Sequence, residues 1–428
     1  MSGSPRRPAS ASQVTGSARR RPPPNVVAGF ILLAIVGGVL LWQRPWVDDA
    51  AEASRLPEDA SAQLDDVLRA MSQADDRESF VAAVDADQAS RTFAEDAWDS
   101  REALGVTSAS LRLVDGGSVA DRDDGTAAAR VRVSWSVDDD SVLAGTEVSD
   151  VDVLVRVAGT PDGQVSLRSS ETGGEPVPLW LAGRAEVDRA DDAHVVRLDG
   201  GARDLPSGEL AEQAARTVRA TLSTGDDVLT LVSPATAEVA AAVLGRPLDG
   251  LDRVAAVTTT VDGSRETPRL VVLNPDEFET MDRRAAQVVI THEAVHQLTG
   301  IVGTGVETWV AEGFADWVAL REDDAPLALS AGQVLRRVEQ DGPPERLPTQ
   351  ADFESAEHGI GAVYESAWMV FRMLDDDGVP EQDIVDFYRA VLDGDEVDEA
   401  ARRTLGRSVE QVTRQWQDYL TKSASTVS

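Results

Sequence analysis

The chain has 428 residues, enough for two domains and a tail, and its 75 acidic and 40 basic residues give a formal net charge of −35 at pH 7. This charge argues against nucleic acid or an anionic lipid surface as a partner of the main body. Cysteine is absent, which excludes disulfides and cysteine-bound zinc, so any metal ion must bind His, Asp or Glu.

The chain begins with residues 1–24, which are rich in Ser, Pro, Gly and Arg. A segment of this composition cannot bury a core, so we expect a disordered tail. The following residues 26–42 are uncharged and almost all apolar, with Trp42 and Trp46 at their end. This pattern predicts a single transmembrane helix over residues 25–46 with an aromatic anchor at the membrane interface.

The charges beside this run predict its orientation. Five arginines precede it and acidic residues follow it, which places the tail in the cytoplasm and the rest of the chain outside a cell membrane. The alternative is a cleaved signal peptide, because Ala51-Glu52-Ala53 resembles a cleavage site. That site lies well past the apolar run, so we favour an uncleaved, single-pass anchor.

Residues 50–200 form a first region in which helical patterns precede strands. Helices are expected near 57–72, 76–86 and 88–103, and strands near 108–114, 131–137, 151–157, 163–169 and 193–198. This order is typical of an α+β domain and resembles, in topology, the NTF2-like (cystatin-like) modules. No chemistry is evident here, and His194 is interpreted as a surface or edge residue rather than a metal ligand.

A Gly-rich linker at 199–206 separates this accessory region from a second domain over residues 204–425. Helices are expected at 207–222 and 235–244, and strands at 228–232, 252–260 and 269–274. The last of these strands lies just before the central motif, where it is either a sheet edge that pairs with an extended substrate or an ordinary strand.

The motif is His292-Glu293-Ala294-Val295-His296, an H-E-x-x-H run on a predicted helix. The two imidazoles lie one turn apart on one face, where both can reach a single metal ion. Glu293 lies to the side of that face, within reach of a water molecule at the metal. The chain has only four histidines, so this spacing is informative; the alternative is a pair of core histidines.

A third ligand is available on a second helix. Glu312 follows His296 by 16 residues, beyond a Gly-rich connector that can reverse the chain, and Thr304 to Glu307 fits a capping box that opens this helix. Asp316 shares the face of Glu312 and can orient a ligand histidine. Either carboxylate alone could be a solvated helix charge, but their apolar neighbours favour pairing or metal binding.

Together, His292-Glu293-x-x-His296 and the later Trp309-Val310-Ala311-Glu312-Gly313-Phe314-Ala315-Asp316-Trp317 resemble the gluzincin metallopeptidases of the peptidase MA-like group. The resemblance covers roughly residues 205–425 and is specific across 270–320. It implies a zincin-like domain, one zinc ion held by His292, His296 and Glu312, Glu293 as general base and Asp316 behind a ligand histidine. The G-x-M-E-N element of the aminopeptidase branch is absent, which favours an endopeptidase.

Beyond residue 320 the pattern is helical, with helices expected near 329–340, 361–376, 379–393, 396–404 and 408–422. Tyr364 and His358 are candidate donors to the oxyanion that develops during hydrolysis. Tyr364-Glu365-Ser366-Ala367-Trp368 is similar to a segment that peptidase MA-like chains carry after the metal motif. The alternative is that Tyr364 and His358 are hydrogen-bonded residues near the active-site cleft with no role in catalysis.

The sequence therefore predicts a membrane-anchored, extracytoplasmic zinc metallopeptidase that acts on a peptide or protein substrate. Two alternatives remain open. One is a non-catalytic zincin-like scaffold that binds a partner, although such a scaffold has no need of Glu293. In the other, residues 50–200 carry the activity and the second domain supports them.

Overall fold

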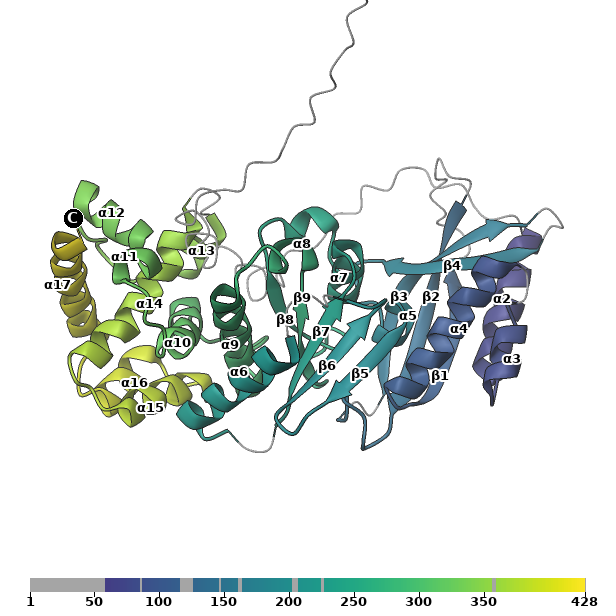
Figure 1. Ribbon diagram of the computed structural model, residues 1–428, viewed down its shortest axis with the longest axis horizontal. Helices are drawn as coiled ribbons and strands as arrows, with labels where there is room; N and C mark the ends of the chain where they lie inside the picture. The colour runs from purple at the N-terminus through teal and green to yellow at the C-terminus, as the bar shows by residue number, and fades with distance from the viewer. Residues whose placement is uncertain are drawn as a thin grey trace, which may run out of the picture.

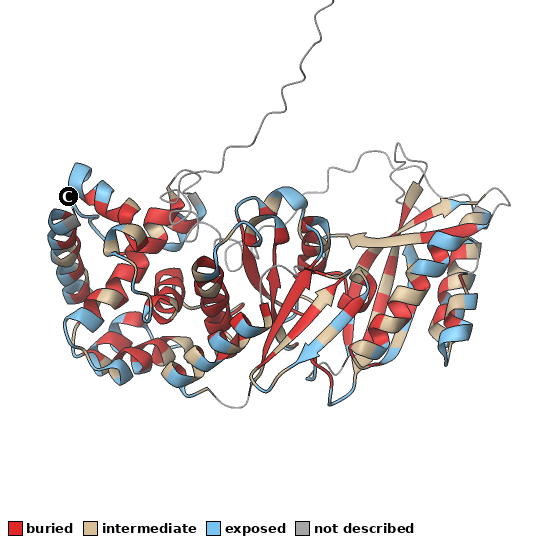
Figure 2. Cartoon of the chain, in the orientation of Figure 1, coloured by how far each residue is buried: buried red, intermediate tan, exposed pale blue. Residues whose placement is uncertain are grey.

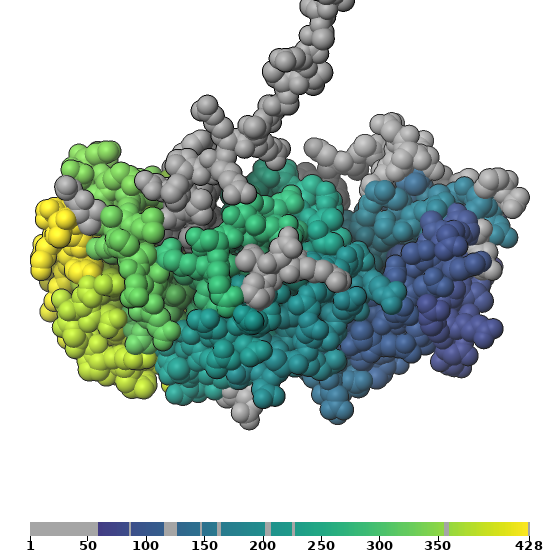
Figure 3. Space-filling view, in the orientation of Figure 1, coloured from purple at the N-terminus to yellow at the C-terminus, as the bar shows by residue number. Residues whose placement is uncertain are grey.

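The computed structural model describes residues 58–84, 87–115, 126–145, 148–160, 164–201, 207–224, 227–355 and 359–427. The fold is mixed α+β, with two sheets and many helices. Figure 1 shows the four-stranded sheet and its helices at one end, the five-stranded sheet in the middle and the C-terminal helices at the other end. The space-filling view shows the same order along the surface (Figure 3).

The first part packs two helices, α2 and α4, on an antiparallel sheet of order β1-β2-β3-β4, and the short α3 lies against these two helices. Its strands alternate buried and solvent-facing residues, as expected when one face is covered. Asp87 caps α4 and also accepts hydrogen bonds from Ser166 and Arg168 on β4, which fixes this helix on the sheet. The elements are α2 (Glu58–Gln73), α3 (Arg77–Ala82), α4 (Gln88–Ala103), β1 (Val106–Asp115), β2 (Thr126–Val137), β3 (Ser149–Gly159), β4 (Val165–Thr172) and α5 (Leu179–Ala182).

The second sheet has the order β5-β6-β7-β9-β8. The pairs β6–β7 and β7–β9 are parallel, whereas β5 and β8 are antiparallel strands at the two edges. The elements are β5 (Ala185–Arg189), β6 (Ala193–Leu198), α6 (Ser207–Leu222), β7 (Leu229–Pro234), α7 (Ala237–Leu244), η2 (Leu248–Leu251), β8 (Ala256–Thr260), β9 (Arg269–Leu273), α8 (Pro275–Phe278) and α9 (Arg283–Thr299).

This second sheet separates two hydrophobic cores. Successive side chains of a strand point to opposite faces, so each central strand contributes to both cores. One face packs against α6 and α9, and the other packs against α7 and the core of the first part. The residues on the first face include Val195, Leu231 and Val271, and those on the second include Val196, Val232 and Val272.

The C-terminal part is helical, and α10 lies within it, in contact with α6, α9, α14 and α15. Figure 2 shows α9 and α10 buried along most of their length, which explains why their sequences lack a clean polar face. The elements are α10 (Thr308–Leu320), α11 (Leu327–Ser330), α12 (Gly332–Asp341), α13 (Gln350–Ser355), α14 (Ile360–Asp376), α15 (Glu381–Leu392), α16 (Val397–Thr404) and α17 (Val409–Val427).

The expected location in a membrane is corrected. Within the described ranges, no helix combines the length and the apolar composition that a membrane span requires. The longest of these helices, α17, carries the charged residues Glu410, Arg414, Asp418 and Lys422 along its length. Residues 1–46, which include the predicted tail and the predicted span at 25–46, lie outside the described residues.

Three local expectations also differ from the structure. The strand before the motif, β9, is an interior strand, and the edge is β8 instead. The capping box at Thr304 is absent, because Glu307 accepts a hydrogen bond from the Trp309 indole and Thr304 donates to the Ile301 carbonyl. Finally, β5 and β6 precede the boundary expected near residue 200 but belong to the second sheet.

Candidate metal centre

The two histidines of the motif lie on α9, whose ends are well defined. Asp282 caps its N-terminus by accepting a hydrogen bond from the Ala285 amide at 2.8 Å, and Gly300 ends it with a φ of 71°. His292 and His296 are 0% and 3% exposed, and their rings meet edge to face with centroids 4.6 Å apart. Both Nε2 atoms therefore reach the same point beside the helix.

Glu312 on α10 completes a group of three buried donors. Its Oε2 atom lies 3.1 Å from His292 Nε2 and 3.5 Å from His296 Nε2, and the two Nε2 atoms are 2.9 Å apart. A tetrahedral zinc ion with bonds of about 2.0–2.1 Å places neighbouring donor atoms about 3.3 Å apart. The donor types and their spacing thus fit one metal ion, and these three residues could hold it.

Asp316, one turn after Glu312, contacts the far side of His292. Its Oδ1 atom lies 2.8 Å from His292 Nδ1, which leaves Nε2 facing the other donors. Burial lowers the pKa of the His292 imidazole, but the carboxylates of Asp316 and Glu312 outweigh this effect and raise it to about 10. The acidic residues thus favour positive charge at this position, whether it comes from a proton or from a cation.

Two polar atoms beside the candidate ligands lack hydrogen-bond partners among the described residues. Among the described residues, His296 Nδ1 and Asp316 Oδ2 are buried and have no hydrogen-bond partner. A ligand histidine usually donates its second ring N–H to an oxygen, so His296 lacks the support that His292 receives. The site thus contacts His292 through both ring nitrogens, whereas His296 has polar contacts through Nε2 alone.

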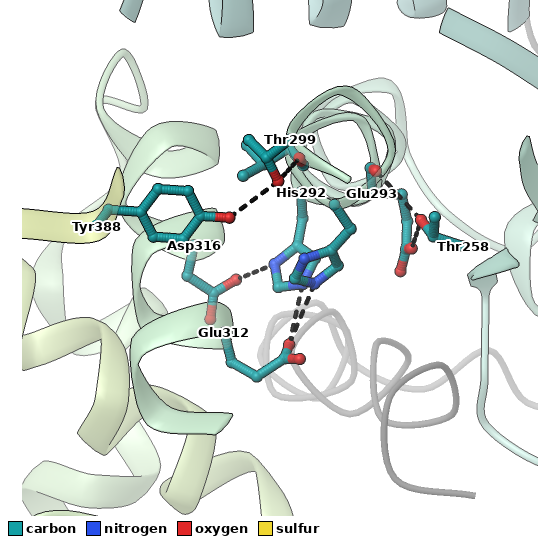
Figure 4. Close-up of polar contacts among 9 residues, drawn as sticks. Thr258, His292, Glu293, Thr299, Glu312, Asp316 and Tyr388 are labelled. Carbon is teal, nitrogen blue, oxygen red and sulfur yellow. Dashed lines mark hydrogen bonds and ion pairs between the residues drawn. The ribbon is translucent and has the colours of Figure 1, made fainter. Parts of the chain in front are cut away.

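Glu293 extends to the opposite side of the imidazoles from Asp316, as Figure 4 shows. Thr258 of β8 lies against it, with its hydroxyl 2.5 Å from Glu293 Oε2 and 3.1 Å from the Glu293 main-chain carbonyl. A hydroxyl has one proton, and the carboxylate is the stronger acceptor. Thr258 therefore fixes one carboxylate oxygen and leaves the other free of this bond.

Tyr364 on α14 is buried, with its ring edge-on to Phe353 at 4.9 Å. Burial raises the pKa of this phenol well above its usual value, and the nearby carboxylates of Glu312, Asp316 and Glu293 raise it further. Tyr364 therefore stays protonated and lies close to the acidic residues of the site. His358, the other predicted donor, lies outside the described residues.

Two neighbours of Glu293 have no counterpart in the sequence analysis. One is Thr258, and the other is Arg246, whose pKa is lowered by burial while the Glu293 carboxylate partly opposes that effect. Neither belongs to a recognisable motif. The sequence shows only that Thr258 belongs to a strand before the motif helix and that Arg246 follows the glycine that ends α7. Neither position by itself indicates contact with Glu293.

The structure thus brings together His292, Glu293, His296, Glu312, Asp316 and Tyr364, all of them buried. His194 lies on β6 and is not one of these residues. Comparisons of the chain with models of known families and with curated proteins gave no match. Its chemistry must therefore be inferred from the site itself.

Proposed function

We propose that this chain is a zinc-dependent metallopeptidase of the gluzincin type that hydrolyses peptide bonds, with a zincin-like fold made of the second sheet and the C-terminal helices, and an NTF2-like fold in the first part. The observation that carries the proposal is the arrangement of Glu293. Its carboxylate lies beside three donors spaced for one metal ion, yet it is not one of them. A site that only stabilises the fold gains nothing from such a carboxylate.

When bound to His292, His296 and Glu312, a zinc ion would polarise the substrate carbonyl and lower the pKa of a water molecule towards about 7. Glu293 would accept the proton of the attacking water and pass it to the leaving amine. Thr258 would hold the Glu293 carboxylate in place, and Asp316 would hold the His292 ring. Tyr364, protonated and close to these carboxylates, would donate to the developing oxyanion.

The sheet offers a place for the substrate. Among the described strands, β8 pairs only with β9, so main-chain groups on its other edge have no strand partner, and an extended peptide would pair with them. Thr258 belongs to this strand and touches Glu293. A peptide that extends the sheet along β8 would therefore run past the general base with little dependence on its side chains.

The test is the metal content of the full chain, measured by mass spectrometry together with hydrolysis of a peptide library. We expect about one zinc per chain, lost in Glu312→Ala and His292→Ala. Glu293→Ala should retain the metal but lose roughly 10²- to 10⁴-fold in turnover, the usual contribution of a general base.

His194→Ala is the matched control, because it removes a histidine from another strand and should change neither metal content nor turnover. Full activity in Glu293→Ala would contradict the mechanism. A chain that takes up no zinc even after reconstitution would instead be a zincin-shaped scaffold, and the proposal would be abandoned.

A further inference from the structure

A second unusual site lies in the first part of the chain, on α4. Arg101 is only 9% exposed, and its guanidinium carbon lies 4.8 Å from the centre of the Trp98 ring. The rings of Phe80 and Trp180 are 5.5 Å and 5.8 Å away. We call Phe80, Trp98, Arg101 and Trp180 the cation–aromatic cluster. Such contacts offset part of the cost of burying a cation, but only part of it.

No acidic side chain among the described residues balances the charge of Arg101. Within the described part of the chain, Arg101 forms no ion pair, and burial alone lowers the pKa of its guanidinium. This is unexpected in a protein with 75 acidic and 40 basic residues. The exposed Arg184, by contrast, lies within ion-pair distance of both Asp96 and Asp99.

Three hydrogen-bond donors of the cluster are also without an acceptor in the part of the chain that the structure describes. Arg101 Nε, Trp98 Nε1 and Trp180 Nε1 are all buried, and none has a partner among the described residues. All three are donors. Unpaired buried donors are rare in proteins and commonly mark a missing water, ion or ligand. Here the missing group must accept hydrogen bonds, and the buried guanidinium favours one that is negatively charged.

We propose that the cation–aromatic cluster is a binding site for the carboxylate group of an organic acid. A carboxylate matches the fork of a guanidinium, and the surrounding rings favour an acid whose body is flat and apolar. The carboxylate could belong to a free aromatic acid or to the carboxyl terminus of a peptide. This proposal involves residues separate from the metal centre and does not depend on the proposed peptidase activity.

The experiment is calorimetric titration of the full chain with benzoate and with benzamide, a neutral molecule of nearly the same shape. N-acetylphenylalanine and its amide form the second pair, which represents a peptide terminus. Each titration is repeated with a chelator, because a carboxylate could also bind a metal ion. We expect at least one acid to bind, its neutral partner to bind at least tenfold more weakly, and the chelator to have no effect.

Arg101→Met should weaken binding of the acid about ten- to a hundredfold, the usual effect of removing a charged hydrogen-bond donor. Without ligand, this variant should melt at the same temperature as the parent or higher, because it removes an unpaired buried charge. A purely structural arginine would give the opposite shift. Arg184→Met, which removes an exposed and already paired arginine, should leave binding of the acid unchanged.

Binding of benzoate alone would identify a free aromatic acid as the ligand. Binding of N-acetylphenylalanine would identify the carboxyl terminus of a peptide. Failure of both acids to bind the parent chain would overturn the proposal. Equal binding of acid and amide, or unchanged binding in Arg101→Met, would do so as well. Because the parent chain alone gives the acid-to-amide comparison, the test does not depend on whether a variant folds.

Discussion

At the scale of single residues, the position of the Glu293 carboxylate depends on one hydroxyl from another element. Thr258 is 3% exposed, and its hydroxyl lies within hydrogen-bond distance of both the carboxylate and the main-chain carbonyl of Glu293. Position 258 is itself fixed by the pairing of β8 with β9, opposite Val271. The edge strand thus sets the rotamer of the proposed general base.

Replacing Thr258 with Val keeps the shape but removes the donor. We expect kcat to fall roughly tenfold, the equivalent of one hydrogen bond to a charged group, with little change in KM or metal content. Thr258→Ser restores the hydroxyl and should recover most of the rate. The measurement is steady-state kinetics with zinc analysis of each variant. An equally slow Thr258→Ser would show that the methyl group, and not the hydroxyl, matters.

The sequence motifs identified the site residues on α9 and α10, but not the residues that reach Glu293 from other elements. His292 and His296 are one turn apart, so their common face follows from helix geometry alone. Thr258 and Arg246 lie far from the motif in the sequence and reach Glu293 only because of how β8 and the end of α7 are placed. No local pattern encodes that placement.

At the scale of elements, a glycine sets the spacing between α10 and α14. A Cβ atom on Gly313 would lie 2.5 Å from the Ala367 carbonyl oxygen and 2.9 Å from the Phe371 ring. Gly313 follows the candidate ligand Glu312, and Ala367 lies one turn after Tyr364 on α14. The close approach of these helices therefore holds Tyr364 near the candidate metal ligands.

Gly313→Ala should destabilise the protein by roughly 1–3 kcal/mol, because the clash involves backbone and cannot be relieved by a rotamer change. It should also lower turnover by moving α14 outward. The control is Gly208→Ala on α6, where a Cβ would meet nothing within 4 Å, so stability should be unchanged or slightly higher. Urea unfolding of both variants tests this, and an equally stable Gly313→Ala would contradict the proposed spacing.

A buried carboxylate on α14 joins this helix to α12. Glu365 of α14 accepts hydrogen bonds from the main-chain amides of Gln333 and Val334, both at 2.7 Å, at the start of α12. Burial raises the pKa of Glu365 to about 7, although these amides and the nearby Arg336 oppose the shift. Glu365 therefore binds its proton more tightly in the folded chain than in the unfolded one.

The sign of the pH effect follows from that difference. The stability contributed by Glu365 is complete below the unfolded pKa near 4.5 and is lost as pH rises through about 7. The loss amounts to roughly 3 kcal/mol across this interval. The measurement is the free energy of unfolding of the parent and of Glu365→Gln at pH 5 and at pH 8. Relative to the parent, the variant should be more stable at pH 8 than at pH 5. Glu339→Gln, on the exposed face of α12, is the control; a pH-independent difference for Glu365→Gln would contradict the assignment.

At the scale of the whole molecule, the periodic patterns predicted most elements close to their observed positions. The helix expected at 207–222 coincides with α6, and alternation predicted β2 and β3 within a few residues of their ends. Short elements without a period, such as α5 and β5, were missed because a few residues carry no periodic signal. The Gly-rich composition around residue 200 also did not predict that the strands before it pair with the second sheet.

Because β5 and β6 belong to the second sheet, the chain cannot be cut at the apparent linker without damage to that sheet. A fragment starting after residue 201 would lack β5 and β6, so one edge of β7, a fully buried strand, would be left unpaired. It would also lose the first-part core against which Val232 and Val272 pack. Such exposed edges invite pairing between molecules. The half that carries the candidate metal centre therefore shares a sheet and a core with the residues before the apparent linker, and insertions, deletions or recombination there would disturb both.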